Sequence, residues 1–229
     1  MKPVIGIVGR PDIVDDTSMI KVNDKCRRAV ILSGGIPLLI LPTQDVDYYK
    51  SFVDEIGKLN NDDKKDLIKI LDLCDGIIMP GGVNVFEHDR FICNYCIIRN
   101  KPVLGICLGM QIMSYYDSEY SLLENDEGGF NHNQKDKMVH EVIIKPNTKL
   151  SNIVKDNKFI VNSKHKYHVS RIGEYIVSAI SHDGLIEAIE YPHNDFNIGV
   201  QWHPEDLVKD EINNKKIFVK FINSSKKAK

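Results

Sequence analysis

The stretch Pro102-Val103-Leu104-Gly105-Ile106-Cys107-Leu108-Gly109-Met110-Gln111 decides the fold of this chain. An apolar run typical of a buried strand leads through a cysteine flanked by glycines into a helical pattern. This sequence predicts a nucleophile elbow, in which the turn strains its central residue and leaves no room for a Cβ on the neighbouring glycines. Because a helix N-terminus favours a thiolate over a thiol, Cys107 is the predicted nucleophile.

A second segment, Gly199-Val200-Gln201-Trp202-His203-Pro204-Glu205, contains the groups that a catalytic thiol needs. Such a thiol requires a base to take its proton and a third group to orient that base. In an extended chain, residues two apart project to the same side, and Pro204 stiffens the link between them. We therefore expect His203 to be the base and Glu205 to hold one nitrogen of its ring.

A third segment, Gly76-Ile77-Ile78-Met79-Pro80-Gly81-Gly82, predicts a buried strand that runs into a glycine-rich turn. Such a turn can present a backbone N–H to an oxyanion. The expected oxyanion-hole donors are the backbone N–H groups of Gly82 and of Leu108, which directly follows the nucleophile.

These three segments, in this order and spacing, resemble those of the class I (triad) glutamine amidotransferases. The stretches Lys2–Arg10, Ser33–Pro37 and Val161–His165 are similar to the γ-glutamyl hydrolase branch, which includes γ-glutamyl-γ-aminobutyrate hydrolase and the peptidase C26 group. The resemblance covers roughly residues 2–222. It implies hydrolysis of γ-glutamyl amides through a Cys–His–Glu triad and a γ-glutamyl thioester. It also implies glutamine or a small γ-glutamyl molecule as substrate, with no cofactor and no metal.

The resemblance also implies a set of substrate contacts. Gln111 lies one helical turn after Cys107 and should face the same pocket. The segment His132-Asn133-Gln134, followed by His140, and the segment Asn162-Ser163-x-His165 resemble two substrate loops of the family. The expected substrate-binding residues are therefore Gln111, Gly81, His132, Gln134, Asn162, Ser163 and His165.

Three departures from the hydrolase branch leave the leaving group open. Leu108 stands where γ-glutamyl-γ-aminobutyrate hydrolases usually carry Arg, Lys166-Tyr167 replaces His-Gln, and residues 115–131 lack a Gly-Gly-Thr pattern. With a substituted amine as leaving group the chain is a hydrolase. With ammonia it is a glutaminase that supplies a synthase partner. A non-catalytic regulatory module on the same fold is a third alternative, which the complete triad disfavours.

Composition limits the remaining possibilities. A chain of 229 residues fits a single α/β domain over residues 1–229, with a frayed tail at 228–229. A net charge of −2 gives no electrostatic case for nucleic acid, and no stretch approaches the ~20 apolar residues that cross a bilayer. Five cysteines without a secretion signal are typical of a reducing cytosol, so we expect a cytoplasmic protein of unknown oligomeric state.

Apolar runs that alternate with helical patterns predict an α/β fold with a central, mostly parallel sheet flanked by helices. Strands are expected over 3–8, 36–41, 75–79 and 102–106, and helices over 17–33, 48–58, 63–73 and 86–100. A mixed or antiparallel C-terminal extension should contain strands over 139–144, 159–161, 175–181, 186–191 and 198–202, before a helix over 212–222. Catalytic groups should then lie at the carboxyl ends of the strands.

The remaining chemical side chains have simpler explanations. Cys93 and Cys96 form a lone C-x-x-C pair with no second ligand pair at metal-binding spacing, so we expect them in the core with Cys26 and Cys74. The run 88–90 (His-Asp-Arg) is expected on a solvated helix start.

Overall fold

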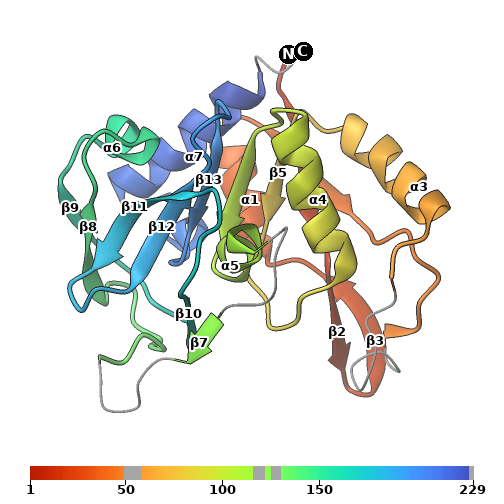
Figure 1. Ribbon diagram of the computed structural model, residues 1–229, viewed down its shortest axis with the longest axis horizontal. Coiled ribbons are helices and arrows are strands. Elements are labelled where there is room, and N and C mark those ends of the chain that lie inside the picture. The colour runs from red at the N-terminus through yellow and green to blue at the C-terminus, as the bar shows by residue number, and fades with distance from the viewer. Residues whose placement is uncertain (49–57, 116–121, 125–129, 227–229) are drawn as a thin grey trace.

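A nine-stranded mixed sheet forms the centre of the computed structural model, which describes residues 1–48, 58–115, 122–124 and 130–226 (Figure 1). In spatial order its strands are β4 (Ile36–Ile40), β1 (Val4–Val8), β5 (Gly76–Met79), β6 (Val103–Ile106), β13 (Asn197–Val200), β12 (Ile186–Glu190), β11 (Ile176–Ser181), β8 (His140–Ile144) and β9 (Lys158–Val161). The run from β4 to β13 is parallel, and the pairs from β13 to β9 are antiparallel. The predicted parallel sheet with an antiparallel extension is confirmed.

Helices cover both faces of the sheet (Figure 1). One face packs against α1 (Asp24–Leu32), α6 (Lys149–Val154) and α7 (Ile212–Ser225), and the other against α3 (Asn61–Asp72), α4 (Glu87–Ile98) and α5 (Leu108–Ser114). Successive residues of a strand project to opposite faces, so Ile78 joins one core while Ile77 and Met79 join the other. Burial on both faces explains why β5 is apolar along its whole length.

The expected strands of the sheet are observed, with boundaries that shift by one or two residues, and the helices expected over 63–73, 86–100 and 212–222 appear as α3, α4 and α7. The helix expected over 48–58 and the expected tail at 228–229 lie almost wholly outside the described residues. Among the described helices, none combines the length and apolar character that crossing a membrane requires.

The helix predicted over 17–33 is wrong in its first half. Residues 10–21 form a hairpin of β2 (Arg10–Val14) and β3 (Thr17–Lys21), and α1 begins only at Asp24. Asp15 and Asp16 have φ angles of 48° and 57°, as a two-residue hairpin turn of type I′ requires. Cross-strand pairing satisfies the backbone groups that a helix from Thr17 would have used.

Asn23, the residue directly before α1, caps the N-terminus of that helix. The Asn23 side chain accepts a hydrogen bond from the backbone N–H of Lys25, at 3.0 Å. The hairpin and α1 are therefore separate elements. The hairpin begins two residues after β1, at the carboxyl end of that strand. A second small sheet, formed by β7 (Leu122–Glu124) and β10 (Tyr167–Val169), also lies at the end of the molecule opposite the two termini (Figure 1).

Candidate active site

Cys107 occupies a strained turn between β6 and α5. Its φ and ψ angles are 53° and −109°, a region that non-glycine residues rarely adopt. Its backbone N–H donates to the Val200 carbonyl at 2.8 Å, and its carbonyl accepts from the Gln111 N–H at 3.1 Å. Pairing to β13 and the first turn of α5 thus hold the backbone in this conformation.

The flanking glycines are required by close backbone approach. A Cβ added at Gly109 would lie 2.0 Å from the Met79 carbonyl oxygen, and one added at Gly105 would lie 2.2 Å from the Met113 sulfur and 2.9 Å from the Gly109 backbone. Backbone cannot move aside as a flexible side chain can. The predicted nucleophile elbow is therefore present.

His203 and Glu205 lie at the start of a short 3₁₀ turn, η1 (Pro204–Asp206), which follows β13. The Nδ1 atom of His203 is 2.8 Å from Oε1 of Glu205, whose side chain is 2% exposed. Burial by itself lowers the pKa of His203. The Glu205 carboxylate and a hydrogen bond with Cys107 outweigh burial and raise that pKa well above its ordinary value. The site therefore favours an imidazolium between a carboxylate and the cysteine sulfur.

The backbone of His203 is held by a side chain from a distant segment. Asn162 follows β9, and its Nδ2 donates to the His203 carbonyl at 3.0 Å. Its Oδ1 accepts from the His203 N–H at 2.8 Å. The amide of Asn162 thus contacts the residue expected to act as base, whereas the sequence had predicted a contact with substrate.

The glycine turn after β5 faces the nucleophile and the base. A Cβ at Gly81 would lie 2.9 Å from Cε1 of His203 and 3.5 Å from Cβ of Cys107. A Cβ at Gly82 would lie 3.1 Å from Cδ2 of Leu108. The two residues expected to donate to the oxyanion are therefore neighbours, and Gly81 leaves the space beside the triad free.

Arg10 fixes this turn, a role that the sequence reasoning missed. Its Nη2 donates to the Pro80 carbonyl at 2.9 Å, and its Nη1 forms an ion pair with Asp89 at the start of α4. Both side chains are buried, at 7% and 0% exposure. The sequence signal was an arginine directly after an apolar strand, but its partner lies 79 residues away.

A cavity of about 460 Å³ adjoins the triad on the side of the base and the glycine turn. Its described lining comes from the β2–β3 hairpin and the segment after it, the glycine turn, and the segment that contains His203 and Glu205. The lining residues are Arg10, Pro11, Asp12, Lys21, Val22, Asn23, Cys26, Pro80, Gly81, Gly82, Val83, Asn84, His203 and Glu205. Cys107 and Leu108 are not in this set, so the described lining reaches the expected base and its carboxylate but not the nucleophile.

Most of the residues that we expected to bind substrate do not line this cavity. Gln111 is buried, and its Nε2 donates to the Tyr167 carbonyl and to Oε1 of Gln201, both at 3.0 Å. The backbone N–H of Gln134 donates to the Ser163 carbonyl at 2.9 Å, which joins the two predicted loops. His132, Ser163 and His165 are buried together, and none of the loop residues is in the described lining of the cavity.

The prediction of a solvated helix start at 88–90 is wrong. His88 and Asp89 are 1% and 0% exposed. The His88 ring stacks on Phe86 with centroids 5.5 Å apart, and burial lowers the pKa of His88. The ion pair between Asp89 and Arg10 explains why this polar run turns inward.

The other four cysteines are buried and free of disulfides, as expected. Burial raises the pKa of Cys74 to about 11 and that of Cys96 to about 12. Burial also raises the pKa values of Cys26 and Cys93 well above the ordinary value. These thiols remain protonated near neutral pH and suit a packing role.

The chain is similar to several known proteins. A model of the peptidase C26 family matches residues 87–205, a range that contains the elbow and the His-x-Glu segment. A glutamine amidotransferase-like protein of Rickettsia prowazekii is 29% identical over 90% of this chain and 92% of its own length. A candidate glutamine amidotransferase of Schizosaccharomyces pombe is 30% identical over 86% of this chain and 80% of its own length.

Two further matches involve CTP synthases. A CTP synthase of Hydrogenobaculum sp. is 29% identical over 78% of this chain and 41% of its own length. The glutaminase domain of Trypanosoma brucei CTPS, solved with bound acivicin, matches with a TM-score of 0.65 and 17% identity, covering 98% of this chain and 94% of that one. The second match shows a shared fold.

Proposed function

Because this chain belongs to the peptidase C26 family of glutamine amidotransferase-like proteins, we propose that it hydrolyses γ-glutamyl amides with Cys107 as nucleophile. Family membership makes the protein a hydrolase or amidotransferase. The observation that carries the finer assignment is the His203 ring, hydrogen-bonded to Glu205 and to the sulfur of a strained elbow.

The proposed reaction has two halves. In the first, the Cys107 sulfur attacks the side-chain carbonyl carbon of the γ-glutamyl group. The resulting oxyanion is stabilised by the backbone N–H groups of Gly82 and Leu108. The protonated ring of His203 then donates its proton to the leaving amine as the carbon–nitrogen bond breaks, which leaves a γ-glutamyl thioester.

In the second half, water replaces the amine. Neutral His203 takes a proton from the water as its oxygen adds to the thioester carbonyl. The carbon–sulfur bond then breaks, glutamate leaves, and the thiolate–imidazolium pair is restored. Glu205 keeps its charge throughout and holds the ring in one orientation.

The cavity next to the base favours a substituted amine as leaving group. It offers about 460 Å³ between the β2–β3 hairpin and the glycine turn, far more than ammonia needs. Arg10, Asp12 and Lys21 give its wall charges of both signs, which suits a leaving group that is itself polar.

A glutaminase that supplies ammonia to a synthase is the second candidate. The observation that favours it is the similarity to part of a CTP synthase and to a glutaminase domain. Leu108, in place of the arginine usual in γ-glutamyl-γ-aminobutyrate hydrolases, points the same way.

Released glutamate distinguishes these candidates. The purified chain is incubated alone with glutamine and with a panel of γ-glutamyl amides of substituted amines, with Cys107→Ala as blank. We expect a higher kcat/KM for at least one substituted amide than for glutamine. Activity on glutamine alone, or only after a synthase is added, would support the second candidate. Failure of an electrophilic glutamine analogue to label Cys107 would indicate a non-catalytic module.

A further inference from the structure

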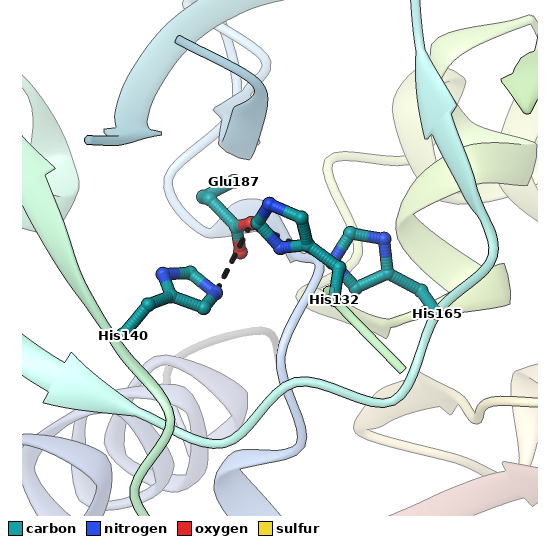
Figure 2. Close-up of side chains that lie close together, drawn as sticks. All are labelled: His132, His140, His165 and Glu187. Carbon is teal, nitrogen blue, oxygen red and sulfur yellow. Dashed lines mark ion pairs between the residues drawn. The ribbon is translucent and has the colours of Figure 1, made fainter. Parts of the chain in front are cut away.

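Four buried side chains from separate segments lie close together (Figure 2). His132 lies in the segment before β8, His140 begins β8, His165 lies between β9 and β10, and Glu187 belongs to β12. Each is at most 4% exposed. Three imidazoles and a carboxylate form the set of ligands that borderline divalent metals such as zinc prefer.

The distances centre on one carboxylate oxygen. Oε1 of Glu187 lies 3.6 Å from Nδ1 of His132, 3.5 Å from Nε2 of His140 and 3.6 Å from Nε2 of His165. All four ligand atoms lie within 4.8 Å of one another. Ligands of a tetrahedral zinc ion, with bonds of 2.0–2.1 Å, stand about 3.3 Å apart. The cluster therefore needs only small side-chain movements to bind such an ion.

In each histidine ring, one nitrogen faces Glu187, and the other, outer nitrogen contacts an oxygen. Nε2 of His132 is 3.0 Å from Oδ2 of Asp183. Nδ1 of His140 is 3.2 Å from the Glu141 carbonyl, and Nδ1 of His165 is 3.0 Å from the Tyr167 carbonyl. Because a carbonyl only accepts, these partners assign the proton of the His140 and His165 rings to Nδ1. His132 differs, because its Nδ1 also lies 3.2 Å from the Ser163 hydroxyl, which itself donates to the His132 carbonyl. Nε2 of His140 and Nε2 of His165 then direct a lone pair toward Glu187, the orientation that outer hydrogen bonds impose on metal-bound histidines.

This arrangement leaves acceptors facing one another in the protein interior. Within the described residues, Nε2 of His140 and both carboxylate oxygens of Glu187 are buried without a hydrogen-bond partner. Buried polar groups are nearly always paired, and an uncompensated carboxylate is costly. A cation at the centre of the cluster would pair with the His140 nitrogen and the Glu187 carboxylate at once.

We propose that His132, His140, His165 and Glu187 bind one divalent transition-metal ion, with zinc as the expected occupant. This proposal replaces the sequence-based expectation that the protein has no metal. Calcium and magnesium do not suit the site, because they prefer an all-oxygen shell. With four protein ligands and no exposed position, the site is of the closed, structural type, and it does not depend on the proposed γ-glutamyl hydrolysis.

The ion would tie the catalytic base to the antiparallel half of the sheet. Asn162, which holds the His203 backbone, lies three residues before the ligand His165. The carbonyl of Glu187 accepts from the Gln201 N–H at 2.7 Å, two residues before His203. Metal binding would therefore fix both segments that flank the base.

Metal content tests the proposal directly. Protein produced without a histidine tag is analysed by elemental mass spectrometry, then stripped with a chelator and titrated with zinc. We expect about one equivalent per chain and recovery of that equivalent on titration. Glu187→Gln and His140→Gln should bind at least tenfold more weakly, whereas His193→Gln, which changes an exposed histidine on the β12–β13 turn, should match the wild type.

A second variant keeps the proposal testable if those two misfold. Asp183→Asn leaves every ligand in place and weakens the hydrogen bonds of Asp183 with His132 and Ser181, so we expect an affinity loss of about 10–100-fold. Stripping should also lower the Tm of the wild type but not that of Glu187→Gln. No zinc binding by the wild type before or after titration would overturn the proposal. Binding that is retained in Glu187→Gln, or lost in Cys107→Ala, would overturn it equally, because the ion would then sit elsewhere.

Discussion

His203 and Glu205 are joined by a 2.8 Å contact between Nδ1 and Oε1, and the carboxylate that makes it is almost fully buried. A buried carboxylate aligns the ring and favours its protonated form. The ring can then act on the Cys107 sulfur with its other nitrogen. This contact explains both the orientation and the raised pKa of the expected base.

Replacing Cys107 by alanine should abolish hydrolysis. The triad acts as a unit, so loss of the nucleophile should cost about 10⁴-fold or more in kcat while the Tm changes little. Released glutamate and thermal unfolding measure the two effects. Cys96→Ala is the matched control, because that thiol is buried in the core. Equal activity in the wild type and Cys107→Ala would disprove the mechanism.

Substitutions of His203 and Glu205 should lower kcat to different extents. His203→Ala removes the base, whereas Glu205→Gln removes a charge and can retain the hydrogen bond that orients the ring. We expect a greater loss of kcat in His203→Ala. A greater loss in Glu205→Gln would show that the two roles are wrongly assigned.

The same pair should make stability depend on pH. Because the pKa of folded His203 is raised, its protonation stabilises the fold fully below the unfolded value of about 6.5. That stabilisation is lost as the pH rises through the folded-state pKa. Urea unfolding should therefore show a larger deficit for Glu205→Gln at pH 6 than at the highest pH the protein tolerates. Asp66→Asn, which removes an exposed ion pair with Lys69 on α3, should show a far smaller trend.

Asn162→Ala should lower kcat with little change in KM. Its amide contacts the backbone of His203 on both sides, so its loss should displace the base, and small displacements can cost about 10²-fold. Steady-state kinetics with Asn133→Ala, an exposed change nearby, as control would measure this. A raised KM with unchanged kcat would instead place Asn162 on the substrate, as the sequence predicted.

Gly109→Ala should destabilise the protein by about 3 kcal/mol or more, because its Cβ would lie 2.0 Å from the Met79 carbonyl oxygen. Gly82→Ala is the comparison, since the atoms near its Cβ belong to the side chains of Leu108 and Arg10 and not to the backbone, and they lie at 3.1 Å and beyond. Urea unfolding should show a far smaller effect there. Similar losses at both positions would contradict the steric explanation of the elbow.

The features that the sequence predicted correctly are local. The elbow depends on glycines next to Cys107, and the His203–Glu205 contact joins residues two apart. The β2–β3 hairpin was missed because Thr17 and Ser18 can cap a helix as readily as they can enter a strand, and only pairing with residues 10–14 decides between these outcomes.

By itself, the sequence determined the order of the strands in the central sheet and the segments that contain the proposed catalytic groups, because apolar periodicity and glycine-flanked turns act over a few residues. Tertiary structure decided which distant groups meet. It paired Arg10 with Asp89 across 79 residues, turned Asn162 toward His203, and brought His132, His140 and His165 around Glu187. Contacts of this kind depend on how strands pair and helices pack, which the residues of one segment cannot specify.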